Sequence, residues 1–219
     1  MGTAERRKRE RERKEREIVE AARSLFFQKG FDATTVDEIA ARLEVSKGTI
    51  YLYFTNKDEI YFAVAREGLM IVRDLFRDAL EGPGTGLERL EAIGRAYIHF
   101  WSSQPDYRRL FHDTRLKVPP ESSGPQGMEF ARAGAEAFGM MVEAIRAGME
   151  DGSIRPDTSP EKLAFCASSM VDGILERMER RGGRAIGPPR DEALEYAFDL
   201  MIRAVASPPE RAPARKPDH

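Results

Sequence analysis

The chain has 219 residues, of which 41% are hydrophobic and 33% are charged, and its formal net charge at pH 7 is −2. This length and apolar content predict one or two globular domains with a sizeable core. A single cysteine, Cys166, excludes an internal disulfide framework and fits the reducing cytoplasm. No apolar run reaches the roughly 18–20 residues that span a bilayer. We therefore expect a cytoplasmic protein. Because the net charge is close to zero, a surface that binds a negatively charged polymer must come from basic side chains placed together on one face.

The N-terminal segment is almost entirely charged. Residues 6–17 read RRKRERERKERE, and opposite charges recur four positions apart, as in Arg11 with Glu15. In a helix each such pair contributes only about 0.2–0.5 kcal/mol. The run therefore predicts a solvated extension of a first helix, which gains an apolar stripe at Ile18 and ends at Gly30.

Residues 34–62, TTVDEIAARLEVSKGTIYLYFTNKDEIYF, contain two short helical patterns around a tight turn. Thr35 followed by Glu38 is a capping box, and Ser46 can cap the second helix. Two short helices around a turn of three or four residues form a helix-turn-helix, whose second helix can lie in a DNA major groove.

Helical patterns also fill the rest of the chain, and no convincing strand alternation interrupts them. The further helices are expected at residues 57–80, 87–103, immediately after Pro105, and at 128–150, 160–181 and 191–206. Residues 117–127 read as a polar, proline-rich loop and residues 207–219 as a disordered tail. The patterns predict an all-α chain.

The helix-turn-helix region also carries an ordered set of residues with specific spacing. The set consists of Phe26, Gly30, Phe31, Thr34-Thr35-Val36, Ile39-Ala40, Val45-Ser46-Lys47-Gly48-Thr49, Tyr51, Tyr53-Phe54, Lys57 and Glu59. On these residues, Ile18 to Phe62 resembles the DNA-binding domain of the tetracycline-repressor (TetR) family of bacterial transcriptional regulators. The resemblance implies about nine helices, with an N-terminal three-helix DNA-binding domain and a C-terminal helical bundle for ligand binding and dimerisation. The expected division is residues 1–17 (charged extension), 18–62 (DNA binding), 63–206 (effector binding and dimerisation) and 207–219 (tail).

The second short helix should bind DNA. Ile50 and Phe54 lie four apart and should face the core, which leaves the polar residues for the exposed face. The residues expected to bind DNA are Thr34, Thr35, Lys47, Gly48, Thr49, Tyr51, Tyr53 and Lys57. From composition alone, the two tyrosines could equally cover the small core. The charged N-terminal run could enter a minor groove, but its interspersed glutamates favour a solvated helix face.

The bundle carries large apolar residues that can form a pocket or simply pack a core. The residues expected to line an effector pocket are Phe100, Trp101, Phe111, Phe130, Phe138, Met141 and Met170. Apolar stripes on the last two helices predict a dimer interface, with completion of the monomer core as the alternative. The expected interface residues are Ala167, Val171, Ile174, Met178, Phe198, Met201 and Ile202.

Signatures of catalysis are missing from the sequence. It contains no glycine-rich phosphate loop, no close histidine pair, no metal-spaced His/Cys cluster and no G-x-S-x-G. We therefore expect no enzyme activity, no cofactor and no metal. The sequence and the resemblance together predict a homodimeric, ligand-responsive regulator, most simply a repressor, that binds a palindromic operator in double-stranded DNA and is released by a small hydrophobic effector. The alternative is a helical DNA-binding or interaction protein controlled by a protein partner.

Overall fold

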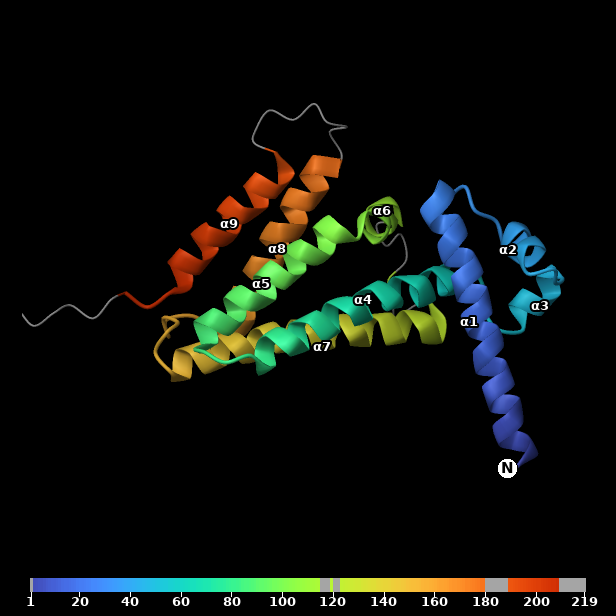
Figure 1. Ribbon diagram of the computed structural model, residues 1–219, viewed down its shortest axis with the longest axis horizontal. Helices are drawn as coiled ribbons and strands as arrows, with labels where there is room; N and C mark the ends of the chain where they lie inside the picture. Colours follow the sequence, from blue (N-terminus) through green and yellow to red (C-terminus); the bar gives the residue numbers. More distant parts are fainter. Residues whose placement is uncertain (1, 115–118, 120–122, 180–188, 209–219) are drawn as a thin grey trace, which may run out of the picture. The chain divides into compact units, whose positions relative to one another are not determined.

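The computed structural model describes residues 2–114, 119, 123–179 and 189–208 (Figure 1). Within these residues the chain forms nine α-helices and one isolated β-bridge, so the expectation of an all-α fold is confirmed. The helices are α1 (Thr3–Lys29), α2 (Val36–Arg42), α3 (Lys47–Tyr51), α4 (Lys57–Glu81), α5 (Gly86–Ser103), α6 (Pro105–Thr114), α7 (Gly124–Glu150), α8 (Pro160–Glu179) and α9 (Arg190–Val205). None of the described helices is long and apolar enough to cross a membrane.

Two helices differ from the expected boundaries. α7 begins at Gly124, four residues earlier than predicted, inside the expected loop of residues 117–127. Pro125 falls in the first helical turn, where its missing N–H removes no intrahelical hydrogen bond. The sequence pattern predicts that the second short helix runs from Lys47 to Phe54, but α3 ends at Tyr51 and the chain turns before Phe54.

The chain divides into two compact units. Unit 1 comprises residues 1–77 and 96–139, and unit 2 comprises residues 78–95 and 140–219. The division cuts α4, α5 and α7, so these units do not coincide with the domain limits expected from the sequence. The helix-turn-helix and the aromatic residues of α6 belong to unit 1, whereas α8 and α9 belong to unit 2.

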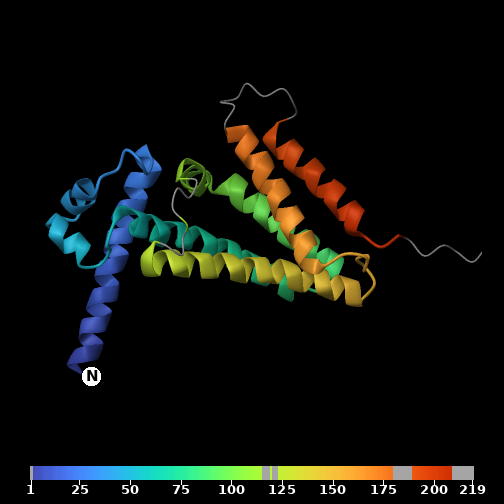
Figure 2. The ribbon, with the colours of Figure 1, turned by 180° about the vertical axis from the view of Figure 1, so that it is seen from behind.

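Unit 2 is organised by the packing of α8 on α9, which run side by side in both views (Figures 1 and 2). The start of α5 is tied to the α7–α8 loop, because the N–H of Gly86 donates to the Asp151 carboxylate at 2.7 Å. At this point α5 crosses α7 with no side chain between them. A Cβ atom on Gly86 would lie 1.9 Å from the backbone nitrogen of Gly148. The two glycines therefore set the separation of these helices.

The chain after α9 is also fixed to the α7–α8 loop. Ile154 and Ala206 form the isolated antiparallel bridge, and the N–H of Ser207 donates to the carbonyl of Ser153 at 2.9 Å. Ser207 is thus held in place, and residues 209–219 of the expected disordered tail lie outside the described residues.

Candidate nucleic-acid interface and effector region

The predicted capping box at the start of α2 is present. The Thr35 hydroxyl accepts from the N–H of Glu38 at 3.3 Å, and the Glu38 carboxylate accepts from the N–H of Thr35 at 2.8 Å. Lys29 also donates to this carboxylate. The hydrogen bond from Lys29, followed by those from Thr35, lowers the pKa of Glu38 to about 2. The start of α2 is therefore fixed both to its own cap and to the end of α1.

The turn between α2 and α3 positions the second helix on a small core. Ser46 caps α3 by accepting from the N–H of Thr49 at 3.1 Å. Just before it, Glu44 adopts a left-handed conformation, with φ of 54°, that non-glycine residues rarely take. Ile50 and Phe54 are fully buried, as the sequence predicted. Burial of this face directs the opposite face of α3 outward.

The outward face of α3 combines a cation, an exposed backbone and apolar surface. Lys47 and Gly48 are exposed, and Tyr51 and Leu52 expose 46% and 71% of their surfaces. Lys47 donates to the Asp37 carboxylate at 2.8 Å, and this bond raises the pKa of the lysine. Leu52 was not predicted, although its position two residues after the buried Ile50 places it on the opposite side of the helix.

Other residues expected at the interface are used within the protein. Thr34 is fully buried, and its hydroxyl donates to the carbonyl of Gly30 at 2.8 Å, so this side chain closes the turn after α1 instead of facing solvent. Lys57 donates to the carbonyls of Phe31 and Thr34, both at 2.9 Å, and its nitrogen lies 4.1 Å from the centre of the Phe31 ring. Only one of its three N–H donors is left for another partner.

The charged extension of α1 reaches the turn that follows α3. The Arg11 guanidinium lies 5.2 Å from the centre of the Tyr53 ring, which is half-buried. This geometry fits a cation–π contact, which restricts the orientation of the Tyr53 ring. Thr49 is also half-buried, next to the exposed Lys47 and Gly48.

Four of the expected effector residues share one aromatic cluster in unit 1. The Trp101 ring centre lies 5.2 Å from that of Phe100 and 5.5 Å from that of Phe111, and Phe111 lies 6.0 Å from Phe130. Phe62 of α4 adds a contact of 5.4 Å with Phe130, so α4, α5, α6 and α7 all contribute. We call these five residues the aromatic cluster. Trp101 is 9% exposed, and its buried indole N–H has no hydrogen-bond partner among the described residues.

The remaining expected effector residues lie elsewhere on these helices. Phe138 is half-buried on α7 in unit 1, whereas Met141 and Met170 are half-buried and belong to unit 2.

The outward surface of α8 and α9 differs from the expected interface. Ala167, Val171 and Phe198 are buried within unit 2 itself, and Ile174, Met201 and Ile202 are half-buried. The side chain of Met178 lies outside the described residues. The large apolar residues that unit 2 leaves on the surface are Phe165 (64% exposed), Tyr196 (64%) and Leu200 (49%). They were missed because they fall off the main apolar stripes.

Comparison with known proteins identifies related sequences and structures. Residues 18–64 match the family described as bacterial regulatory proteins, tetR family. These residues form a TetR-family DNA-binding domain. The repressor KstR2 of Mycobacterium tuberculosis is 26% identical over 167 residues, covering 76% of this chain and 82% of that protein. The repressor AcnR of Corynebacterium jeikeium is 27% identical over 192 residues, covering 88% and 92%. The FadR regulator of Bacillus subtilis, solved with stearoyl-CoA, has the same fold, with a TM-score of 0.66, 15% identity, and coverage of 86% and 98%.

This domain and the similarity to curated repressors identify the chain as a transcriptional regulator with a DNA-binding helix-turn-helix and not as an enzyme. Among the described residues no three His, Cys, Asp or Glu side chains gather in a way that could hold a metal ion.

α6 connects the first helix to α4 within unit 1. The Arg23 guanidinium of α1 donates to the Glu67 carboxylate of α4 at 3.0 Å, and the Tyr107 hydroxyl of α6 donates to the same oxygen at 3.4 Å. The Tyr107 ring packs edge-on against Phe27 at 5.0 Å, and burial raises the pKa of its hydroxyl. A Cβ on Gly68 would lie 2.8 Å from this ring, so α4 and α6 are in close contact here.

The aromatic cluster also continues into the core of the helix-turn-helix. Ring contacts of 5.3 Å join Phe62 to Tyr61 and Tyr61 to Phe31, and a contact of 5.5 Å joins Phe31 to Phe26. Unit 1 therefore packs the aromatic cluster and the base of the DNA-reading helices into one core.

Proposed function

We propose that the protein is a ligand-responsive repressor that binds a palindromic operator as a homodimer and is released by a small, hydrophobic effector. We also propose that it acts in the cytoplasm. The observation that carries this proposal is the outward face of α3, opposite the buried Ile50. The residues exposed there are Lys47, Gly48, Tyr51 and Leu52. In a helix-turn-helix the corresponding face of the second helix enters the major groove.

The contacts to DNA divide into two classes. Lys47 and Thr49, at the N-terminal end of α3, are the candidate readers of base edges, and Leu52 adds an apolar surface for a thymine methyl group. Tyr51 and Tyr53 offer hydroxyls to phosphates, and the remaining N–H of Lys57 can do the same. Lys47 must exchange its bond with Asp37 for one with DNA, which favours sites where the lysine gains a good acceptor.

The dimer is proposed to form through α8 and α9, within an effector-binding and dimerisation region of residues 63–206 that follows the DNA-binding residues 18–62. Phe165, Tyr196 and Leu200 supply its exposed apolar surface, in addition to the half-buried members of the predicted set. Burial of such side chains against a twofold-related copy removes apolar area from water and pairs two DNA-reading helices. A palindrome with half-sites about one helical turn apart is the corresponding operator.

The effector is proposed to bind at the aromatic cluster. The rings supply apolar surface from four helices, and the unpaired N–H of Trp101 supplies one directional donor. A buried donor without a partner is unfavourable, so a ligand that brings an acceptor gains that interaction. An effector with a largely apolar body and one carbonyl, hydroxyl or carboxylate fits this chemistry. FadR of Bacillus subtilis, which binds stearoyl-CoA, supports an acyl-bearing ligand as one such class.

Release from DNA requires that the effector bind better to a conformer with a different arrangement of the reading helices. The core shared by the aromatic cluster and the helix-turn-helix, together with the Arg23–Glu67–Tyr107 contacts, is the proposed connection. Because coupling free energies are reciprocal, operator DNA should weaken effector binding by the same factor.

The test is selection of bound duplexes from a random DNA pool at moderate salt. Enrichment of a palindrome by the wild type is expected, and Lys47→Gln should relax the preference at one position of each half-site. Tyr51→Phe should weaken binding to all sequences alike. Salt-sensitive binding without an enriched sequence would contradict the proposal. With the operator in hand, failure of every apolar, acceptor-bearing ligand to release it would favour control by a protein partner.

A further inference from the structure

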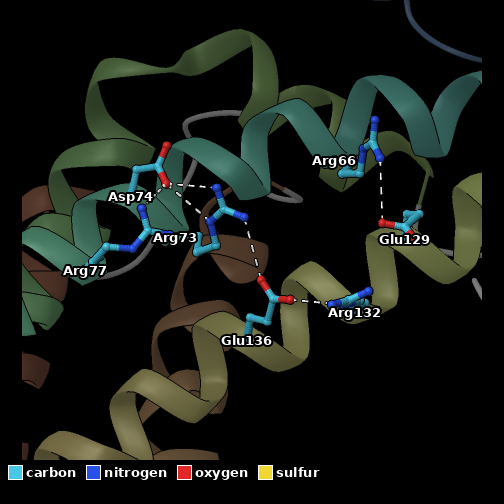
Figure 3. A network of polar contacts seen from close by, with 7 residues as sticks. All are labelled: Arg66, Arg73, Asp74, Arg77, Glu129, Arg132 and Glu136. Carbon is cyan, nitrogen blue, oxygen red and sulfur yellow. Dashed lines mark hydrogen bonds and ion pairs between the residues drawn. The ribbon is translucent and has the colours of Figure 1, made fainter. Parts of the chain in front are cut away.

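Arg66 on α4 combines a loose ion pair with an unpaired, buried donor (Figure 3). Its Nε is buried and has no hydrogen-bond partner among the described residues, and its ion pair with Glu129 spans 3.9 Å between Nη1 and the carboxylate oxygen. That separation is too long for a hydrogen bond. Arg73 and Arg132 in the same network each donate to a carboxylate at 3.3 Å or less. The donors of Arg66 are thus available to a partner that is not part of this network.

Arg66 lies on the wall of two cavities in unit 1. One, of about 270 Å³, is lined by residues of α1, α4 and the start of α7, and the other, of about 310 Å³, lies along α4 and α7. The first cavity also contains Gln126, whose side-chain oxygen is buried and unpaired. Three side-chain atoms of the described residues are buried without a partner, and the residues that carry two of them, one donor and one acceptor, both line this cavity.

The other charges around the first cavity do not satisfy Arg66. Three carboxylates line this cavity. Glu67 accepts from Arg23 at 3.0 Å, Glu15 accepts from Arg11 at 2.9 Å, and Glu12 lies 3.9 Å from the Lys8 nitrogen, so each already has a cation beside it. Arg16 adds a second guanidinium to the wall. The cavity therefore presents arginine donors, an amide acceptor and carboxylates that are largely neutralised by their own partners.

We infer that Arg66 and Gln126 form a binding site for a small oxyanion that carries its own hydrogen-bond donor. The planar guanidinium of Arg66 suits a carboxylate or phosphate group, which it can hold through two N–H donors. A neighbouring hydroxyl or amine of the same ligand donates to the oxygen of Gln126. The cavity, of about 270 Å³, has room for a small metabolite. This site is separate from the aromatic cluster and goes beyond the proposed effector site.

Such a ligand would bind between the first helix of the DNA-binding region and the helices that follow it. The cavity is lined by Val19 of α1, by Phe54 just after α3, and by Ala63 of α4. Phe54 belongs to the buried base of the DNA-reading helices. The bound oxyanion would therefore hold α1 against α4 in one arrangement.

The test uses the full chain without DNA and four probes at constant ionic strength: succinate, L-malate, methyl phosphate and glycerol 3-phosphate. Binding is followed in proton–nitrogen NMR spectra by the backbone amide resonance of Ala63, which lines the cavity and is present in every variant, up to about 10 mM, where a millimolar Kd is visible. We expect saturable shifts from the preferred oxyanion class and tighter binding of its hydroxyl-bearing member. The two probe classes distinguish a carboxylate ligand from a phosphate ligand.

The variants separate the site from general charge effects. Arg66→Gln should weaken binding by about tenfold or more, the scale of a hydrogen bond to a charged group. Arg66→Lys keeps the charge and should weaken it less, with an unchanged melting temperature. Gln126→Leu should remove only the advantage of the hydroxyl-bearing probe. Arg77→Gln is the matched control, because Arg77 lies on the same helix and lines neither cavity, and it should bind like the wild type.

The inference is overturned if no probe shifts the resonance saturably, which would leave the two atoms to ordered water. It is also overturned if Arg66→Gln and Arg77→Gln weaken binding equally. Neither result affects the DNA-binding proposal, since duplex selection is performed without these probes.

Discussion

We expect Leu52→Ala to weaken operator binding by removing an apolar contact with a thymine methyl group. Leu52 leaves 71% of its surface exposed next to Tyr51, on the face of α3 that is proposed to enter the major groove. Full burial of a leucine side chain is worth about 1.5–3 kcal/mol, and alanine retains part of that. With 71% of the surface available, the loss should be about 1 kcal/mol per half-site. For a dimer this doubles to about 2 kcal/mol, or roughly thirtyfold in Kd.

The assay is fluorescence anisotropy on the selected operator, with each thymine of the half-site replaced in turn by uracil. This replacement deletes one methyl group, which contributes about 0.8 kcal/mol when buried, or about fourfold in Kd. Only one thymine should show this loss with the wild type, and the loss should vanish with Leu52→Ala, as a double-mutant cycle requires for a direct contact.

Met128→Ala is the matched control for this experiment. Met128 is also a large apolar residue, 61% exposed, but it lies on α7. Its replacement should leave Kd unchanged. Equal uracil penalties in the wild type and Leu52→Ala would refute the contact, even if Leu52→Ala bound more weakly overall.

Three further predictions concern stability, acid sensitivity and charge. Gly94→Ala should lower the free energy of unfolding by about 1–3 kcal/mol, because its Cβ would lie 2.0 Å from the Phe198 ring, whereas Gly139→Ala, with open space around it, should be neutral or stabilising in a urea titration. Glu38→Gln should flatten the acid limb of the stability curve, since a carboxyl whose pKa falls from 4.5 to about 2 on folding contributes stability above pH 4.5 that is lost as the pH falls towards 2. Asp37→Asn should tighten non-specific DNA binding and steepen its salt dependence by about one unit, because it frees the lysine of α3.

Each of these predictions has an outcome that contradicts it. Equal free energies of unfolding of the two glycine variants in urea would mean that the Phe198 ring can move aside at no cost. An acid limb unchanged by Glu38→Gln would show that other carboxyls dominate between pH 4.5 and 2. Unchanged binding of non-specific DNA by Asp37→Asn, measured from 50 to 200 mM salt, would show that the ion pair does not compete with phosphate.

Local chemistry in the sequence was sufficient to predict the helix-turn-helix. The Thr35–Glu38 box and the Ser46 cap are short-range signals, and the structure forms both. The burial of Ile50 followed from its spacing with Phe54. α7 starts at Gly124, earlier than the pattern predicts, because proline and glycine favour a loop in a sequence pattern, whereas proline is also compatible with a first helical turn.

The partners of individual polar groups could not be predicted, because they depend on long-range packing. The two carbonyls that accept from Lys57 lie 23 and 26 residues earlier in the chain. The unpaired atoms of Arg66 and Gln126 share a cavity only because α4 and α7 pack together. The apolar stripe of α8 likewise identified the face buried within unit 2, while the exposed Phe165 followed from no periodicity.

The crossing of α5 and α7 restricts how unit 2 can move. Because Gly86 and Gly148 bring the two backbones into direct contact, there is no flexible side chain between them to yield. Sliding of either helix would bring a neighbouring Cβ into the backbone of the other, so translation is blocked at this point. Rotation about the contact requires no such overlap. The crossing is thus a pivot, and a rearrangement of unit 2 should appear as a change of interhelical angle at a fixed separation.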